Sequence, residues 1–295
     1  MGIRRSLIPL LLLFSSPPVA AQMVSNVWER VLLVRVGGNS PNAERGTAFT
    51  VDVDGRQYLL TAKHLVITLA ANDFIEYADA GKWVRLPVQV FKCDDPTDIA
   101  VLVAPNQVTT AFEFPVDASK IVYGQDVYFL GFPYSIALNG TNVNGTLPMP
   151  FIKRATYAGI IPLDTAKHSL LIMLDGYNNP GFSGGPIVYR DAFSKSWDYR
   201  LLGVVSGFQP DITDVMKKRP IKSREEASAQ AREQPWRMGT ASDGSLFEYM
   251  ETGNYVALNT GIVRGFAVFP ATELIQKHPI GPKIDAKQFH PSTGR

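Results

Sequence analysis

The sequence is poor in cysteine, in long apolar runs and in net charge. Its single cysteine, Cys93, cannot form a disulfide within the chain, so stability must come from packing. Beyond residue 14 no apolar run approaches the roughly 20 residues that a membrane-spanning helix needs. A net charge of +2 does not favour nucleic-acid binding, which requires clustered Lys and Arg. No Cys/His spacing indicates zinc, and we expect neither a metal nor a cofactor.

Residues 1–21 have the pattern of a signal peptide. Arg4 and Arg5 precede a short apolar run at 7–14, and small residues at 19–21 form a cleavage site that would leave Gln22 first. An uncleaved anchor is the alternative, which the polar sequence after Ala21 disfavours. We therefore expect an exported protein, in the bacterial periplasm or secreted, with no membrane span after cleavage.

The chain is rich in turn-forming residues, with 24 Gly and 21 Pro spread between short β-rich runs. Many short β-rich runs separated by turns predict an all-β sandwich or barrel. Two helices are expected, one after a capping box at Ser223 and Glu226 and one near Pro270. The tail 278–295 should be flexible. The expected strands are 31–36, 47–53, 57–61, 83–91, 99–103, 127–131, 169–174, 186–189, 201–205 and 265–269.

Three short motifs follow one another along the chain. They are residues 61–64 (TAKH), 95–102 (DPTDIAVL) and 181–186 (GFSGGP). Each alone has an ordinary structural explanation, such as a partly buried His, a turn-capping Asp or a Gly-rich loop. The third motif is the most specific, because glycines around one Ser allow a sharp turn that exposes backbone N–H groups. Such donors stabilise a developing oxyanion.

The residue types in these motifs belong together chemically. A Ser hydroxyl is a poor nucleophile near neutral pH and needs a base within hydrogen-bond reach. The imidazole of His64 suits that role, because its ordinary pKa of about 6.5 lets it take and return a proton. The carboxylate of Asp98 would orient that ring and stabilise its protonated form. The order His64, Asp98, Ser183 is that of the chymotrypsin arrangement.

With their neighbours, these motifs resemble trypsin-like, chymotrypsin-fold serine peptidases. The disulfide-free bacterial branch, with glutamyl endopeptidases and periplasmic heat-shock proteases, is the most similar. The resemblance spans about residues 27–277 and implies two six-stranded antiparallel β-barrels, 27–118 and 119–277, with the active site between them and a short C-terminal helix. A charged insertion at 209–250 has no counterpart in the family. The other matching segments are 46–49 (GTAF), 131–133 (GFP), 203–207 (GVVSG) and 265–270 (GFAVFP).

The resemblance implies a serine endopeptidase that acts on proteins or peptides through an acyl-enzyme intermediate. Ser183 would be the nucleophile, His64 the base and Asp98 the orienting acid. The backbone N–H groups of Gly181 and Ser183 would form the oxyanion hole. The expected substrate-binding residues are Tyr177, Ser206, Gly207 and Phe208.

Several residues depart from the family pattern. Phe182 replaces the Asp that pairs with a new N-terminal amine in digestive members, so the site is either preformed or ordered by something else. Tyr177 and Phe208 argue against an acidic pocket for Lys or Arg. Lys63 would be harmless if exposed, but would lower the pKa of His64 if it pointed inward. The insertion leaves from the rim of the cleft, where it could act as a lid or an autoinhibitory segment.

Two other functions remain open from the sequence. One is a non-catalytic, protein-binding domain of the same fold, and the other is an esterase that uses the same triad.

Overall fold

The computed structural model describes residues 25–40, 43–111, 114–117, 119–138, 146–191, 199–223 and 236–285. The expected signal peptide and the helix expected after the capping box at Ser223 lie outside these ranges. Among the described residues, none of the helices is long and apolar enough to cross a membrane.

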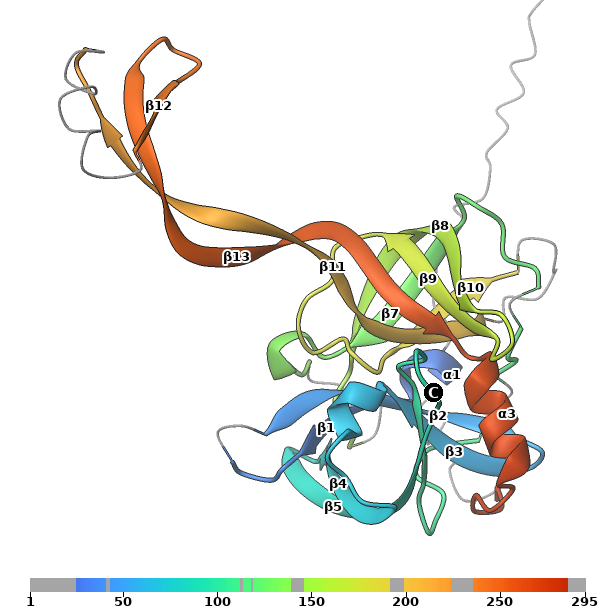
Figure 1. Ribbon diagram of the computed structural model, residues 1–295. Helices are drawn as coiled ribbons and strands as arrows, with labels where there is room; N and C mark the ends of the chain where they lie inside the picture. The colour runs from blue at the N-terminus through green and yellow to red at the C-terminus, as the bar shows by residue number, and fades with distance from the viewer. Residues whose placement is uncertain are drawn as a thin grey trace, which may run out of the picture.

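The N-terminal half of the chain forms a closed six-stranded antiparallel barrel (Figure 1). Around the barrel the strands run in the order β1, β2, β3, β6, β5, β4. The short helix α1 (Ser25–Trp28) precedes them. The strands are β1 (Val31–Val36), β2 (Glu44–Val53), β3 (Arg56–Thr61), β4 (Asn72–Asp79), β5 (Lys82–Lys92) and β6 (Ala100–Val103).

The second half forms a sheet of seven strands in the order β11, β10, β7, β8, β9, β13, β12. Because β11 also pairs with β13, six of these strands close into a second barrel. The helix α3 (Phe269–Lys277) follows β13. The fold class predicted from the sequence is therefore confirmed. The strands are β7 (Asp126–Gly131), β8 (Phe151–Asp164), β9 (Ser169–Asp175), β10 (Pro186–Arg190), β11 (Tyr199–Pro220), β12 (Arg237–Thr240) and β13 (Leu246–Ala267).

The two barrels share one apolar core. Leu60 and Val101 of the first barrel belong to the same buried cluster as Phe132 and Val204 of the second. Ile275 of α3 joins this cluster. The shared core holds the two barrels together, and the candidate site lies where Asp98, just before β6, meets Ser206 of β11.

The two-residue turn at Asp54 and Gly55 shows how the sequence sets local structure. Both residues have positive φ, 50° and 71°, and Val53 pairs with Arg56 across the turn. This is the conformation in which an Asp-Gly pair joins two strands with the correct twist.

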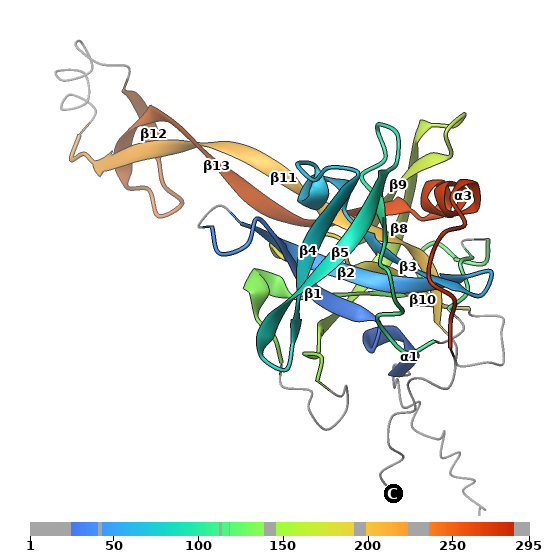
Figure 2. The same cartoon turned by 90° about the horizontal axis from the view of Figure 1, so that it is seen from below.

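The charged insertion, in which no strand was expected, is a β-ribbon over much of its described length. β11 and β13 pair continuously outward from Gly203 and Ala267 to Pro220 and Phe247, with three register shifts. The described part of the ribbon projects away from both barrels (Figures 1 and 2). We call its described part, residues 209–220 and 246–259, the arm.

Three sequence expectations about secondary structure need correction. β4 and β8 were not expected, because charged and polar residues interrupt their apolar pattern. The strand expected at 265–269 ends at Ala267, and α3 begins at Phe269. Residues 278–285 are attached rather than loose, since Gln57 N–H donates to Pro282 O at 3.0 Å and Ile284 N–H donates to Gly55 O at 3.0 Å.

Candidate active site

His64 and Asp98 come from neighbouring strands of the first barrel. The side chains of Leu65 and Val66 are buried and anchor a short 3-10 helix (Lys63–Val66) after β3, which leaves the His64 side chain 45% exposed. Asp98 precedes the fully buried Ile99 and β6. Its Oδ1 accepts the His64 backbone N–H at 2.9 Å, and its Oδ2 lies 2.7 Å from His64 Nδ1. The carboxylate thus holds both the ring and the backbone of His64.

This pairing shifts both pKa values. Burial is the largest influence on His64 and lowers its pKa, but the hydrogen bond and charge of Asp98, with the charge of Glu44, outweigh it and raise the pKa above 6.5. Burial likewise raises the pKa of Asp98, but the contacts with His64 and the Ser206 hydroxyl hold it below 3.8. Near neutral pH Asp98 is therefore ionised beside an imidazole that can accept a proton.

The second barrel adds Ser206 and Ser183 to this pair. Ser206 Oγ donates to Asp98 Oδ2 at 2.6 Å, and the carbonyl of Ser206 accepts a hydrogen bond from Ser183 Oγ at 3.0 Å. Ser206 of β11 therefore links the expected acid to the expected nucleophile. Within the described part of the chain, no hydrogen bond joins Ser183 Oγ to the ring of His64.

The glycines around Ser183 are required by close packing. Gly184 has φ +84°, and a Cβ there would lie 2.0 Å from the carbonyl oxygen of Thr47. Gly181 has φ +105°, and a Cβ there would lie 2.2 Å from the carbonyl oxygen of Phe132. No group in the described ranges accepts a hydrogen bond from the backbone N–H of Gly181 or Ser183. These N–H groups are the pair that the sequence assigns to the oxyanion hole.

The residues expected to bind substrate lie around this segment. The side chain of Tyr177 is 58% exposed, while Phe208 is half-buried on β11. A Cβ at Gly207 would meet no atom within 4 Å, so the strand next to Ser206 borders open space. Their role in binding stays a prediction.

Lys63 and Cys93 lie beside the site without joining it. Lys63 Nζ donates to Asp95 Oδ1 at 2.6 Å and to Cys93 O at 3.0 Å, so it does not lower the pKa of His64. Burial raises the pKa of the Cys93 thiol to about 12. The thiol therefore stays protonated at neutral pH, as expected of a structural cysteine.

Three residues that support the site were not assigned a role from the sequence. Thr47 on β2 bonds to the segment that carries Ser183 through both its backbone and its side chain, and Lys153 and Asn259 bond to the same segment. Thr47 lies in the matched segment 46–49, which was a usable signal. Nothing in the local sequence distinguishes Lys153 or Asn259.

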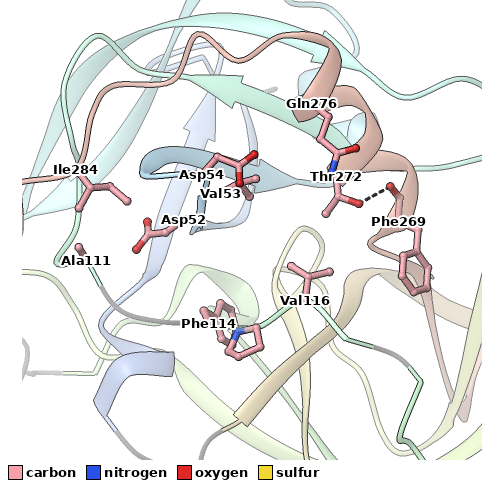
Figure 3. A pocket seen from close by; sticks show the side chains of 11 residues that line it. Asp52, Val53, Asp54, Ala111, Phe114, Val116, Phe269, Thr272, Gln276 and Ile284 are labelled. Atoms are coloured by element: carbon pink, nitrogen blue, oxygen red, sulfur yellow. Dashed lines mark hydrogen bonds between the residues drawn. The ribbon is translucent and has the colours of Figure 1, made fainter.

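One cavity of the protein lies away from this site. It has a volume of about 650 Å³ and lies beside α3, lined by residues such as Asp52, Phe114 and Phe269 (Figure 3). None of the residues His64, Asp98, Ser183 or Ser206 lines it. Among the described residues no cluster of His, Cys, Asp and Glu could hold a metal ion.

Comparison with known proteins identifies the class. A family model of the trypsin-like peptidase domain matches residues 46–192, which include His64, Asp98 and Ser183. The resemblance predicted from the motifs is confirmed, and the chain belongs to the trypsin-like peptidases.

Solved structures with a similar fold include an HtrA-type protease, AlgW, determined with a tripeptide. It is 18% identical, with a TM-score of 0.48 over 86% of this chain and 61% of that chain. This chain therefore spans less than two thirds of that protease. The inactive form of the Rv3671c protease from M. tuberculosis is 15% identical, with a TM-score of 0.45 over 86% of this chain and 90% of that chain.

Proposed function

We propose that the protein is a serine endopeptidase in which Ser183, His64 and Asp98 form the catalytic triad. The observation that carries the proposal is the contact of Asp98 with both His64 Nδ1 and Ser206 Oγ, at 2.7 Å and 2.6 Å. Ser206 in turn holds the hydroxyl of Ser183. A base with an orienting carboxylate, beside a serine with unpaired N–H groups, is the arrangement that acyl transfer needs.

The reaction follows from these positions. The Ser183 hydroxyl leaves the Ser206 carbonyl by rotation about its Cα–Cβ bond and gives its proton to His64 Nε2 as Oγ attacks the scissile carbonyl. The N–H groups of Gly181 and Ser183 then bind the oxyanion. Protonated His64, stabilised by Asp98, donates to the leaving amine. A water molecule, activated by His64, hydrolyses the acyl-enzyme and restores Ser183.

We further propose that the substrate binds as an extended strand beside Ser206, Gly207 and Phe208. The open space at Gly207 supports this, because a peptide could approach the backbone there and pair with it. Tyr177 would contact the side chain on the acyl side of the scissile bond.

The hydrogen bond from Ser183 to the Ser206 carbonyl is the one observation that favours the non-catalytic, protein-binding alternative. Labelling with a fluorophosphonate probe decides between them. The wild type should label at Ser183, while Ser183→Ala should not label, because only an activated serine attacks the probe. A wild type that stays unlabelled from about pH 7 to about pH 9, where His64 is largely neutral, would contradict the proposal.

Labelling would not separate a peptidase from an esterase that uses the same triad. Proteome-wide profiling of cleavage sites makes this distinction. We expect new peptide termini with the wild type and none with Ser183→Ala, and cleavage of ester substrates alone would favour the esterase.

We also propose that the protein is exported and that residues 1–21 are removed. The charged, apolar and small-residue order of the leader supports this. Expression of the full chain in a bacterium should yield a mature protein whose N-terminal residue, read by Edman degradation, is Gln22. Retention of Met1 in the folded product would contradict cleavage.

A further inference from the structure

The segment from Tyr177 to Ser183, here called the oxyanion segment, is held through its backbone carbonyls. Each of these carbonyls accepts a hydrogen bond from elsewhere in the second barrel, from within the segment, or from Thr47 of the first barrel. In chain order the donors are Lys153 Nζ, Asn259 Nδ2, Phe182 N, Tyr134 N, Thr47 Oγ1, Gly185 N and Thr47 N.

This anchoring sets the direction of the N–H groups. In a trans peptide the C=O and N–H of one unit point in opposite directions. Tyr134 N–H holds the carbonyl of Pro180 at 2.7 Å, so the N–H of Gly181 in the same unit faces the other way. The carbonyl of Phe182 is held by Gly185 N–H at 2.9 Å, which orients the N–H of Ser183 in the same manner.

Lys153 makes the only charged contact among these donors. Its Nζ lies 2.8 Å from the carbonyl oxygen of Tyr177 and 2.5 Å from Oδ1 of Asn179. The same atom lies 5.4 Å from the centre of the buried Phe182 ring, within the range of a cation–π contact. A single ammonium thus binds the start and the middle of the segment and lies over the residue that precedes Ser183.

Among the described residues Lys153 contacts a carbonyl and an amide rather than a carboxylate, and burial lowers its pKa. The ammonium is therefore partly desolvated without an ion pair. Its interactions are with a carbonyl, an amide and the face of an aromatic ring. Hydrogen bonds from a charged donor are stronger than neutral ones. The contacts of Lys153 therefore stabilise this conformation of the oxyanion segment.

We infer that Lys153 is a positioning residue that keeps the oxyanion segment in its active conformation. Phe182 cannot form the ion pair with an N-terminal amine that orders the site in digestive members. Lys153 takes over this ordering role. This inference rests on the proposed peptidase function. Lys153 touches no reacting atom and acts through Tyr177, Asn179 and Phe182.

The test compares Lys153→Met with the wild type. Loss of the ammonium should reduce kcat for a peptide substrate by about 10- to 100-fold, which is no more than the fall in kcat when one oxyanion donor is removed. KM should change by less than about threefold, because the substrate-binding residues are unaltered. The rate of fluorophosphonate labelling at Ser183 should fall by the same factor, because both reactions need the N–H groups in place. Lys153→Arg retains a cation and should restore most of kcat.

Arg154→Met is the matched control. Arg154 is the next residue on β8, its side chain is 70% exposed, and its ion-pair contact to Asp126 is 3.8 Å long. This variant should keep the wild-type kcat. If Lys153→Met proves unfolded by circular dichroism, Lys153→Gln replaces it, and the same fall in kcat is expected because a neutral, shorter amide cannot bind both acceptors.

An unchanged kcat in the folded Lys153 variant, or an equal fall in Arg154→Met, would overturn the inference while leaving the proposed function intact. A wild type that neither labels nor cleaves peptides would instead overturn the proposed function itself.

Discussion

Replacing Asp98 by Asn should lower kcat by about 10⁴-fold, the effect expected when the base is held in the wrong tautomer. The carboxylate accepts from His64 Nδ1, from the His64 backbone N–H and from Ser206 Oγ. An Asn amide at this position can present N–H to Nδ1, which would leave the proton on Nε2, where the base must be free. Steady-state kinetics with a fluorogenic peptide measure the loss.

The same variant should change the pH dependence. His64 acts as base only when neutral, so activity falls as pH drops through its pKa, which in the wild type is raised above 6.5. Asp98→Asn removes the hydrogen bond and the charge that raise this pKa and leaves the burial that lowers it. The acidic limb of kcat/KM should therefore move to lower pH, while the maximum falls.

Asp95→Asn is the matched control for Asp98→Asn. Asp95 is an exposed carboxylate in the same motif, and it contacts Lys63 rather than His64. Its replacement should leave both kcat and the acidic limb unchanged. Equal losses in the two variants would show that charge in this loop, rather than contact with His64, supports activity.

Replacing Gly184 by Ala should both destabilise the protein and inactivate it. The residue has positive φ, and the new Cβ would lie 2.0 Å from Thr47 O and 2.4 Å from Thr61 Oγ1. Backbone strain and steric overlap together should cost about 3–5 kcal/mol, which lowers Tm by about 10 °C in a domain of this size. Because Thr47 also holds the carbonyl of Ser183, any shift displaces the nucleophile, and a displacement of about 1 Å can cost about 100-fold in rate.

Gly55→Ala separates strain from overlap. Gly55 also has positive φ, +71°, but a Cβ there would meet no atom within 4 Å. We expect a loss of about 1 kcal/mol in stability and full activity. Differential scanning calorimetry and the labelling rate at Ser183 measure both effects. Similar Tm values for the two variants would contradict the role assigned to the contact between Gly184 and Thr47.

The strands that the sequence predicted best are those in the shared core and the two barrel interiors. β1 is buried along its whole length and is apolar except for Arg35. The Asp-Gly pair at 54–55 likewise predicts the tight turn that the structure shows. β8 was missed because the adjacent charged residues Lys153 and Arg154 interrupt its apolar pattern. The arm was misread because both of its strands are largely exposed beyond the barrel, with side chains such as Ile212 and Tyr255 at 66% and 71%. Its strands are set by pairing with each other, which local composition does not reveal.

The sequence by itself determined the class of protein and the candidate residues His64, Asp98 and Ser183, because each lies in a short motif whose chemistry is local. Only the tertiary structure decided how these residues meet. Ser206 connects Asp98 to Ser183 because β11 of the second barrel packs next to the residues that precede β6 of the first. The anchoring of the oxyanion segment by Thr47, Lys153 and Asn259 was not predicted from the sequence, although Thr47 lies in a matched segment. The physical reason is distance along the chain: these donors come from strands separated from Ser183 by 30 to over 130 positions, as in the bond from Thr47 to Gly181 at a separation of 134.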